Sequence, residues 1–184
     1  MRTDAAGRIL DAALEELVRR GAGAFAMHEV AGRAGVSKGL IHYHFHDKNA
    51  LLADIAPRLG ERIGARARRA LSDSTTTTAI HDLENWLRAE LELAEWRGLL
   101  ALADWPAPEV RRAADAALDA RRGAMQHVLE RLFVLLDIQS RIALGALVDL
   151  AVAVVNGLAV GRESARDPRP ALDALVMAFY KLGD

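Results

Sequence analysis

The chain has 184 residues, with 24 lysines and arginines against 25 aspartates and glutamates, so its formal net charge is −1. Bulk positive charge is therefore excluded as a means of holding nucleic acid, and any such contact has to come from a local arrangement of side chains. Hydrophobic residues make up 52% and charged residues 27% of the chain, which excludes disorder and allows one ordinary domain or a small domain joined to a medium one. The sequence contains no cysteine, which excludes disulfides, thiol catalysis and thiolate zinc sites.

Apolar residues recur at helical spacing along nearly the whole chain, and the alternation typical of strands is almost absent. We therefore predict an all-α protein with about nine helices. The first three predicted helices cover about 4–20, 27–34 and 37–45. A fourth begins at 47 or 48 and runs toward a polar linker at 72–78. The last five cover about 80–94, 96–104, 108–136, 142–160 and 171–182.

Pro57 lies inside the fourth predicted helix. A proline there removes one backbone hydrogen bond and clashes with the preceding turn, so we expect a kink or a helix boundary. A kink would be either a tolerated irregularity or a hinge that links a ligand site to a DNA-binding domain.

The segment from Ile142 to Val160 is apolar except for Asp149 and Asn156, and its length approaches that of a membrane span. An aspartate is costly in lipid, so a buried helix shared with a partner subunit is the stronger interpretation. The two polar residues lie on one helix face, either as a satisfied pair at a subunit boundary or as an anchor in a ligand cavity. Since the first ten residues lack the apolar run of a secretory signal, we expect a cytoplasmic protein.

Two short predicted helices meet at Gly35 within the stretch "AGRAGVSKGLIHYHF", residues 31–45. Glycine permits a positive φ at the joining turn, and Ala31 and Ala34 permit close packing. This pattern predicts a helix-turn-helix, in which the second helix lies in the DNA major groove with its N-terminal residues at the base edges. The residues expected to contact bases or phosphates are His28, Ser37, Lys38, Gly39, Leu40, His42, Tyr43, His44 and Lys48.

Residues 8–52 resemble the N-terminal domain of the tetracycline-repressor (TetR) family. The resemblance rests on a first helix that ends in a glycine, on an "(I/V)A..AGVSKG" core and on an "(I/L)Y.HF..K..L" tail. The matching positions are Gly21, Val30, Ala31, Ala34, Gly35, Val36, Ser37, Gly39, Ile41, His44, Phe45, Lys48 and Leu51. Two positions depart from this pattern: Ala26 replaces a capping Thr or Ser, whose loss should cost about 1 kcal/mol, and His42 replaces a Tyr.

The resemblance implies a helix-turn-helix DNA-binding domain at 1–47 and a ligand-binding and dimerisation domain at 48–184. It also implies a homodimer whose last two long helices form a four-helix bundle, and a pocket among the middle helices whose ligand releases the operator. We therefore expect a ligand-responsive transcriptional regulator, a repressor at a palindromic operator, and not an enzyme. The alternative is a helical scaffold or adaptor that keeps the fold without binding DNA specifically.

Two further sets of residues are expected in the second domain. The candidates for the effector pocket, where the tryptophans could equally fill the core, are Trp86, Trp96, Trp105 and Asn156. The candidates for the dimer interface are Leu147, Leu150, Val154, Leu158, Leu175 and Phe179. Few fixed charges accompany the middle helices, so we expect an apolar or amphipathic effector. We expect no cofactor and no metal site, because His42 and His46, four residues apart, have no obvious third ligand.

Overall fold

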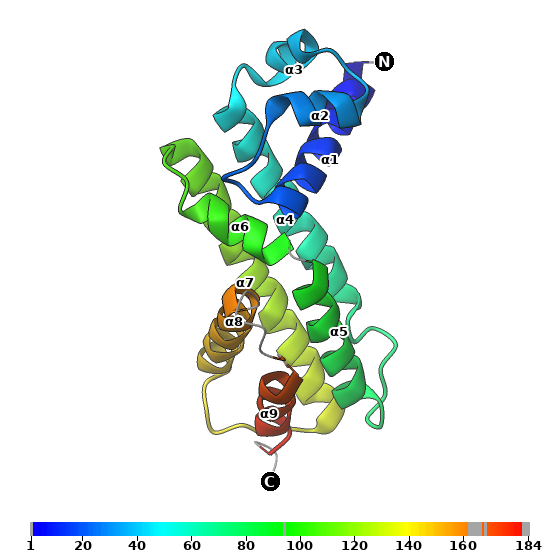
Figure 1. Ribbon diagram of the computed structural model, residues 1–184. Coiled ribbons are helices and arrows are strands. Elements are labelled where there is room, and N and C mark those ends of the chain that lie inside the picture. The colour runs from blue at the N-terminus through cyan, green and yellow to red at the C-terminus, as the bar shows by residue number, and fades with distance from the viewer. Residues whose placement is uncertain (1, 94, 162–166, 168, 182–184) are drawn as a thin grey trace. The chain divides into compact units, whose positions relative to one another are not determined.

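The computed structural model of the protein describes residues 2–93, 95–161, 167 and 169–181 (Figure 1). Within these residues the chain forms helices and no strand, which confirms the all-α prediction. The helices are α1 (Arg2–Arg20), α2 (Met27–Ala34), α3 (Lys38–Phe45), α4 (Lys48–Arg69), α5 (Ala79–Leu93), α6 (Glu95–Ala103), α7 (Pro108–Leu136), α8 (Leu144–Gly161) and α9 (Arg169–Tyr180).

The predicted helix boundaries agree with this structure to within a few residues, and those of α2 and α7 agree at both ends. α4 runs as one helix through Pro57, so the alternative of a helix boundary at this proline is wrong. The last helix begins at Arg169 and ends at Tyr180, two residues before the predicted start and end. No helix within the described residues combines the length and the apolar content that a membrane crossing needs.

The chain divides into two compact units, each of which has its own core. Unit 1 comprises Met1–Glu61 and Arg97–Leu118, and unit 2 comprises Arg62–Trp96 and Asp119–Asp184. The division falls inside α4, α6 and α7, rather than between two helices. It does not coincide with the boundary expected at residue 47, and the two functional domains therefore remain a prediction.

The core of unit 1 is built from the apolar faces of α1, α2, α3 and the first part of α4. α1 contacts both α2 and α3, and α2 contacts α3. Each fully buried leucine or isoleucine in such a core contributes about 1.5–3 kcal/mol. α4 also approaches α7 closely, since a Cβ atom on Gly60 would lie 3.1 Å from the Cβ of Ala117. The buried side chains include Ile9, Ala13, Leu17, Val30, Ile41, Phe45, Leu51 and Leu52.

The core of unit 2 is formed by α5, α8 and α9, which contact one another in all three pairings, together with the second part of α7. The buried positions on these helices recur three or four residues apart, as the apolar stripes in the sequence predict. They include Leu83, Leu87, Leu91, Val128, Leu132, Val148, Ala151, Val155, Leu172 and Val176.

Replacing Gly35 with alanine should destabilise the protein, whereas the same change at Gly32 should stabilise it. Both glycines have open space where a Cβ would stand, but Gly35 has a φ of +64° and Gly32 lies inside α2. The left-handed conformation should cost alanine about 1–2 kcal/mol, and a helical alanine should gain about 0.5–1 kcal/mol over glycine. Urea unfolding of the two variants measures both effects, and equal shifts of the midpoint would contradict the argument.

Candidate nucleic-acid interface and effector site

The turn between α2 and α3 is closed by backbone hydrogen bonds that require the left-handed residue. Gly35 has φ 64° and ψ 39°, and the N–H of Val36 donates to the carbonyl of Ala31 at 3.1 Å. This is the six-to-one bond that ends many helices at a glycine. Ser37 then caps α3, because its Oγ accepts from the N–H of Leu40 at 3.2 Å. The start of α3 is thus held in place by the backbone of the turn and by the side chain of Ser37, while Ala26 gives α2 no side-chain cap.

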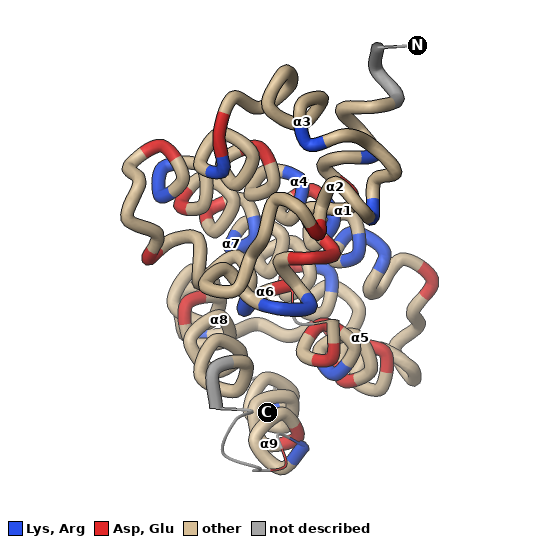
Figure 2. The backbone as a smooth tube through the Cα atoms, turned by 45° about the horizontal axis from the view of Figure 1, so that its top comes forward, with Lys and Arg blue, Asp and Glu red and all other residues tan. Residues whose placement is uncertain are grey.

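α3 has one buried face and one exposed face. Ile41 and Phe45 are 0% and 5% exposed and hold the helix on the core of unit 1. Lys38, Gly39 and His42 are exposed, and Tyr43 is 63% exposed. Figure 2 shows α3 as a nearly uncharged tube, in which Lys38 is the single lysine, arginine, aspartate or glutamate. The exposed face therefore offers hydrogen-bond donors and an aromatic ring rather than a dense positive charge.

The end of α3 is fixed by a contact between two of the histidines. Nδ1 of His42 lies 2.8 Å from the carbonyl oxygen of His46, and the N–H of His46 donates to the carbonyl of His42 at 3.0 Å. When Nδ1 carries the proton it donates to that carbonyl, which leaves Nε2 of His42 for a group outside the protein. Within the described part of the chain, no three His, Cys, Asp or Glu side chains are grouped as metal ligands.

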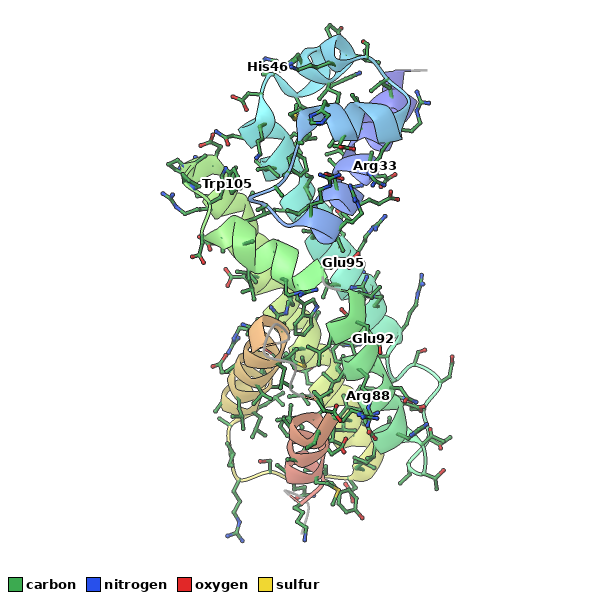
Figure 3. All side chains as sticks on the ribbon, in the orientation of Figure 1. Arg33, His46, Arg88, Glu92, Glu95 and Trp105 are labelled. Carbon is green, nitrogen blue, oxygen red and sulfur yellow. The ribbon has the colours of Figure 1, made fainter. Side chains whose placement is uncertain are left out.

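Lys48, at the start of α4, lies over two aromatic rings of unit 1. Its Nζ is 4.8 Å from the centre of the Trp105 ring and 5.4 Å from that of Phe25, and burial lowers the pKa of this lysine. Nε1 of Trp105 donates to Oδ1 of Asn49 at 2.9 Å. Trp105 lies in the segment between α6 and α7 (Figure 3). These contacts tie Trp105, a predicted pocket residue, to the first turn of α4.

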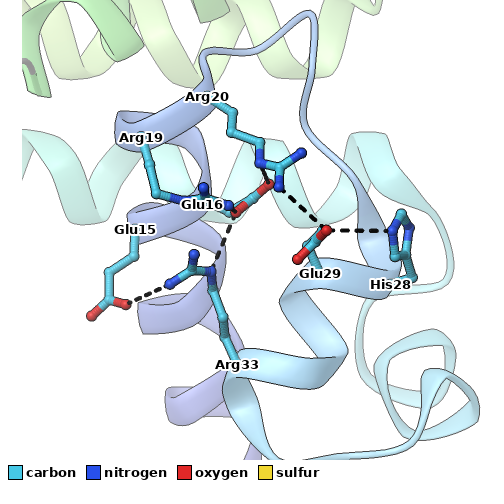
Figure 4. Close-up of polar contacts among 7 residues, drawn as sticks. All are labelled: Glu15, Glu16, Arg19, Arg20, His28, Glu29 and Arg33. Atoms are coloured by element: carbon cyan, nitrogen blue, oxygen red, sulfur yellow. Dashed lines mark hydrogen bonds and ion pairs between the residues drawn. The ribbon is translucent and has the colours of Figure 1, made fainter.

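Glu16 on α1 is completely buried and is surrounded by three arginines (Figure 4). Its carboxylate lies 2.8 Å from Nη2 of Arg19, 3.2 Å from Nε of Arg20 and 3.3 Å from Nε of Arg33. Because Arg33 belongs to α2, this carboxylate joins the first helix to the helix that precedes the turn. Burial alone raises the pKa of Glu16, but the hydrogen bonds from Arg19 and Arg33 and the charges of Arg19 and Arg20 outweigh it and leave the pKa below its usual value.

His28, a predicted DNA contact, lies at the edge of the same network (Figure 4). Its Nε2 is 3.6 Å from Oε1 of Glu29, which also pairs with Arg20 at 3.3 Å. The imidazole side chain is 77% exposed, so it can still reach a group outside the protein.

In unit 2, a buried polar cluster brings together two of the predicted pocket residues. Arg121 on α7 is 2% exposed, and its guanidinium lies 3.5 Å from the centre of the Trp96 ring. Nη2 of Arg121 donates to Oδ1 of Asn156 on α8 at 2.6 Å. Burial lowers the pKa of Arg121 to about 10, and the Glu90 carboxylate acts in the opposite direction. Arg121 is therefore still charged at neutral pH.

The two buried carboxylates of unit 2 are paired with other arginines. Glu90 on α5 accepts from Nε and Nη2 of Arg66 at 2.5 and 2.9 Å, and from Nε1 of Trp96 at 3.0 Å. Glu95, at the start of α6 (Figure 3), lies 2.6 Å from Nη2 of Arg66 and 3.5 Å from Nη1 of Arg62. Both carboxylates are therefore ion-paired with arginines other than Arg121, although Oε2 of Glu95 has no hydrogen-bond partner among the described residues.

The remaining polar and aromatic candidates have separate surroundings. Asp149 is exposed and accepts from Nε of Arg122 at 2.6 Å, a hydrogen bond that lowers its pKa. Trp86 is 9% exposed, and its Nε1 has no hydrogen-bond partner in the described structure. A pocket of about 270 Å³ lies elsewhere in unit 2, and none of the predicted pocket residues lines it; its walls are Ala67, Arg68, Leu71, Ser72, His127, Val128 and Arg131.

Our sequence analysis missed Arg121 and Glu90, although the helical spacing contained a signal for both. The buried stripe of α7 runs through Ala117, position 121 and Met125, so an arginine stands where an apolar residue is expected. Glu90 lies four residues after Trp86 on the buried face of α5. A charged residue on a buried stripe is paired or functional, because burying a lone charge is expensive.

Comparison with known proteins gives one family and several solved folds. Residues 9–55 match the family described as bacterial regulatory proteins, tetR family. The HTH-type transcriptional activator FasR of Mycolicibacterium smegmatis is 36% identical over 91 residues, which are 50% of this chain and 39% of that protein. The chain therefore matches less than half of that relative's length. These proteins are regulators of transcription and not enzymes.

Two solved structures share the fold along nearly the whole chain. The transcriptional regulator FadR from Bacillus subtilis, in complex with stearoyl-CoA, has a TM-score of 0.67 at 16% identity and covers 95% of this chain and 97% of its own. A transcriptional regulator from Saccharomonospora viridis, in complex with choline, has a TM-score of 0.71 at 19% identity and covers 97% of this chain and 95% of its own. At these identities the likeness shows the fold alone.

Replacing Glu16 with glutamine should destabilise the protein at pH 7 by about 1–3 kcal/mol, because three arginines lose their charged acceptor. The pKa of Glu16 is lowered in the folded state, so its contribution is present above the unfolded value of about 4.3 and is lost as the pH falls further. Urea unfolding at several pH values should show the difference between wild type and variant shrinking below about pH 4.

Glu15→Gln provides the control for this prediction. Glu15 is 65% exposed and lies 3.9 Å from Arg33, so its replacement should change stability by less than about 0.5 kcal/mol. A Glu16→Gln penalty that stays constant from pH 7 to pH 3 would contradict the assignment.

Proposed function

We propose that this chain, whose residues 9–55 match the TetR family of bacterial regulatory proteins, is a transcriptional regulator that binds a palindromic operator as a homodimer and is released by a small-molecule effector. The observation that carries the proposal is the exposed face of α3, which starts at the Ser37 cap and presents Lys38, Gly39 and Tyr43. The proposed DNA-binding domain is 1–47, and the proposed ligand-binding and dimerisation domain is 48–184. A regulator of bacterial genes works where the chromosome lies, so we place it in the cytoplasm.

The chemistry of α3 suits the major groove, which admits one helix. Lys38 donates to guanine acceptors, Gly39 allows close approach of the backbone, and Leu40 contacts a thymine methyl group. His42 and Tyr43, farther along the exposed face, donate to phosphates and fix the position of the helix. His28, His44 and Lys48 complete the proposed contact set, and Lys48 reaches DNA only if its ammonium leaves the two rings over which it lies.

We propose that the homodimer forms through the exposed apolar surface of α8 and α9. Leu150 on α8 and Met177 on α9 are each 49% exposed, and Tyr180 is 48% exposed. α8 carries a single charged residue, Asp149, and appears almost uncharged along its length in Figure 2. Such a surface is typical of a helix that packs against a partner subunit. Val154 and Leu158 are half-buried and belong to the same proposed surface.

The other three predicted interface residues lie inside the chain's own core. Leu147, Leu175 and Phe179 are 4%, 6% and 2% exposed. These three residues offer little surface to a partner. Their role in the proposed interface is indirect, because they pack α8 and α9 against the rest of unit 2.

We propose that the effector binds in unit 2, beside Trp96 and Asn156, and that it is amphipathic. The solved relatives named above contain stearoyl-CoA and choline, so this fold accommodates chemically different small molecules. Repression is the proposed mode of action. FasR is an activator, and a reporter gene placed behind the operator decides between the two signs of regulation.

Lys38→Ala should weaken operator binding about tenfold and relax the preference for one base pair in each half-site, as expected when a guanine contact worth 1–3 kcal/mol is lost. The operator is first selected from a pool of random duplexes, and affinity is then measured by fluorescence anisotropy at several salt concentrations. Arg68→Ala, which removes one exposed positive charge from unit 2, is the control and should leave the base preference unchanged. A pool that yields no enriched sequence would favour the scaffold alternative.

Leu150→Glu should convert the dimer to a monomer, because it places a charge in the proposed apolar contact. Sedimentation equilibrium should give the protomer mass of 20.0 kDa for this variant and twice that mass for the wild type. Val134→Glu is the matched control, since Val134 on α7 is 73% exposed and lies outside the proposed surface. A wild-type protein that sediments as a monomer at micromolar concentration would refute the dimer.

A further inference from the structure

Arg121 carries buried hydrogen-bond donors that have no acceptor. A guanidinium has five N–H donors, and the single described acceptor of Arg121 is the amide oxygen of Asn156, which binds Nη2. Nε and Nη1 are inaccessible to solvent and have no partner in the described structure. Buried donors are nearly always satisfied in folded proteins, so this group needs an acceptor that the described part of the chain does not supply.

The neighbouring carboxylates do not fill this role. Both oxygens of Glu90 accept from Arg66, and one of them also accepts from Trp96. Glu95 is paired with Arg66 and Arg62. Glu90 therefore acts on Arg121 through its charge, without a hydrogen bond, and the charge of Arg121 is only partly balanced.

The surroundings of Arg121 are those of a binding site built by four helices. Trp96 of α6 covers one face of the guanidinium, Asn156 of α8 holds one end of it, and Glu90 of α5 acts on it through its charge. The unpartnered donors of Arg121 can serve a ligand that accepts hydrogen bonds and carries negative charge.

We propose that Arg121 binds an oxyanion on the effector, which makes the effector an amphipathic acid whose head group is a carboxylate or a phosphate. This inference rests on the proposed function, because it assigns a ligand class to the effector site of unit 2. An oxyanion supplies strong charge-assisted hydrogen bonds to a guanidinium, and these bonds are stronger still in a buried site. A buried arginine also repels cations, so a quaternary ammonium ligand is excluded from this position.

The test uses the full-length protein without DNA and a panel of probes that differ in their head groups. The probes are octanoate, octyl phosphate, octanol and octyltrimethylammonium, together with acetate and inorganic phosphate, which have no tail. Tryptophan fluorescence follows binding, because Trp96 lies directly against the guanidinium. Octanoate or octyl phosphate should bind at least tenfold more tightly than octanol, and the better of the two identifies the head group.

Variants at two adjacent arginines separate the site from general charge effects. Arg121→Met should abolish the preference for the acid over the alcohol, and Arg121→Lys should retain part of it. Arg122→Met is the matched control, since Arg122 is half exposed and pairs with Asp149 at the surface. It should leave the preference unchanged.

A second measurement on the wild type does not depend on the folding of a variant. The Nε–H resonance of Arg121, assigned in ¹⁵N-labelled protein by its loss in Arg121→Lys, should shift with octanoate or octyl phosphate, and not with octanol. Equal affinity for acid and alcohol, or an unmoved resonance with every anionic probe including acetate and phosphate, would overturn the inference. Operator release is measured separately, so an acid that binds at Arg121 without releasing DNA counts against the proposed function and not against this site.

Discussion

The buried carboxylate of Glu16 is the interaction on which the presentation of α3 depends. It holds Arg33 of α2 against α1, and α2 in turn ends at the Gly35 turn that sets the direction of α3. A carboxylate inside a protein is stable only when charged donors surround it, and here Arg19 and Arg20 supply that surrounding from the same helix. α3 is therefore oriented by an ionic network between α1 and α2, in addition to its own small apolar face.

Each unit contains buried charge, but the two networks differ in their ion pairs. Oε1 of Glu16 has no hydrogen-bond partner but lies 3.2 Å from Nε of Arg20, whereas Nε and Nη1 of Arg121 have neither a hydrogen bond nor an ion pair among the described residues. In unit 1, the buried group is the carboxylate of Glu16. The three arginines around it are partly exposed, so water solvates the positive charge that Glu16 does not neutralise. In unit 2, a base is the buried group, and the acids near it are already engaged with Arg66. A satisfied network stabilises one arrangement, whereas an incompletely satisfied one favours whatever completes it. The second arrangement suits a unit whose state should depend on a ligand.

The local parts of this structure could be predicted from sequence, because local rules decide them. Gly35 and Ser37 were expected to close the turn and cap α3, and the structure has both features, with φ 64° at the glycine and a 3.2 Å bond at the serine. The role of Trp105 could not be predicted, since its partner Asn49 is 56 residues away in sequence. The buried position of Arg121 was missed for a different reason. Ala117 and Met125, four residues before and after it, already formed an apolar stripe on α7, so the arginine between them was not predicted to be a buried residue.

On the proposed function, the low charge of α3 has a consequence for how the protein searches a chromosome. Its exposed face has one lysine and a set of neutral or titratable donors, and the whole chain has a net charge of −1. Attraction to arbitrary DNA comes almost entirely from displaced counterions, and few are displaced by so few cations. Each encounter with an unrelated sequence is then brief, and few copies are held on the rest of the genome. With α3 as the proposed reader, occupancy of a target is governed by how well its bases match this helix, and a modest number of molecules can keep such a site filled.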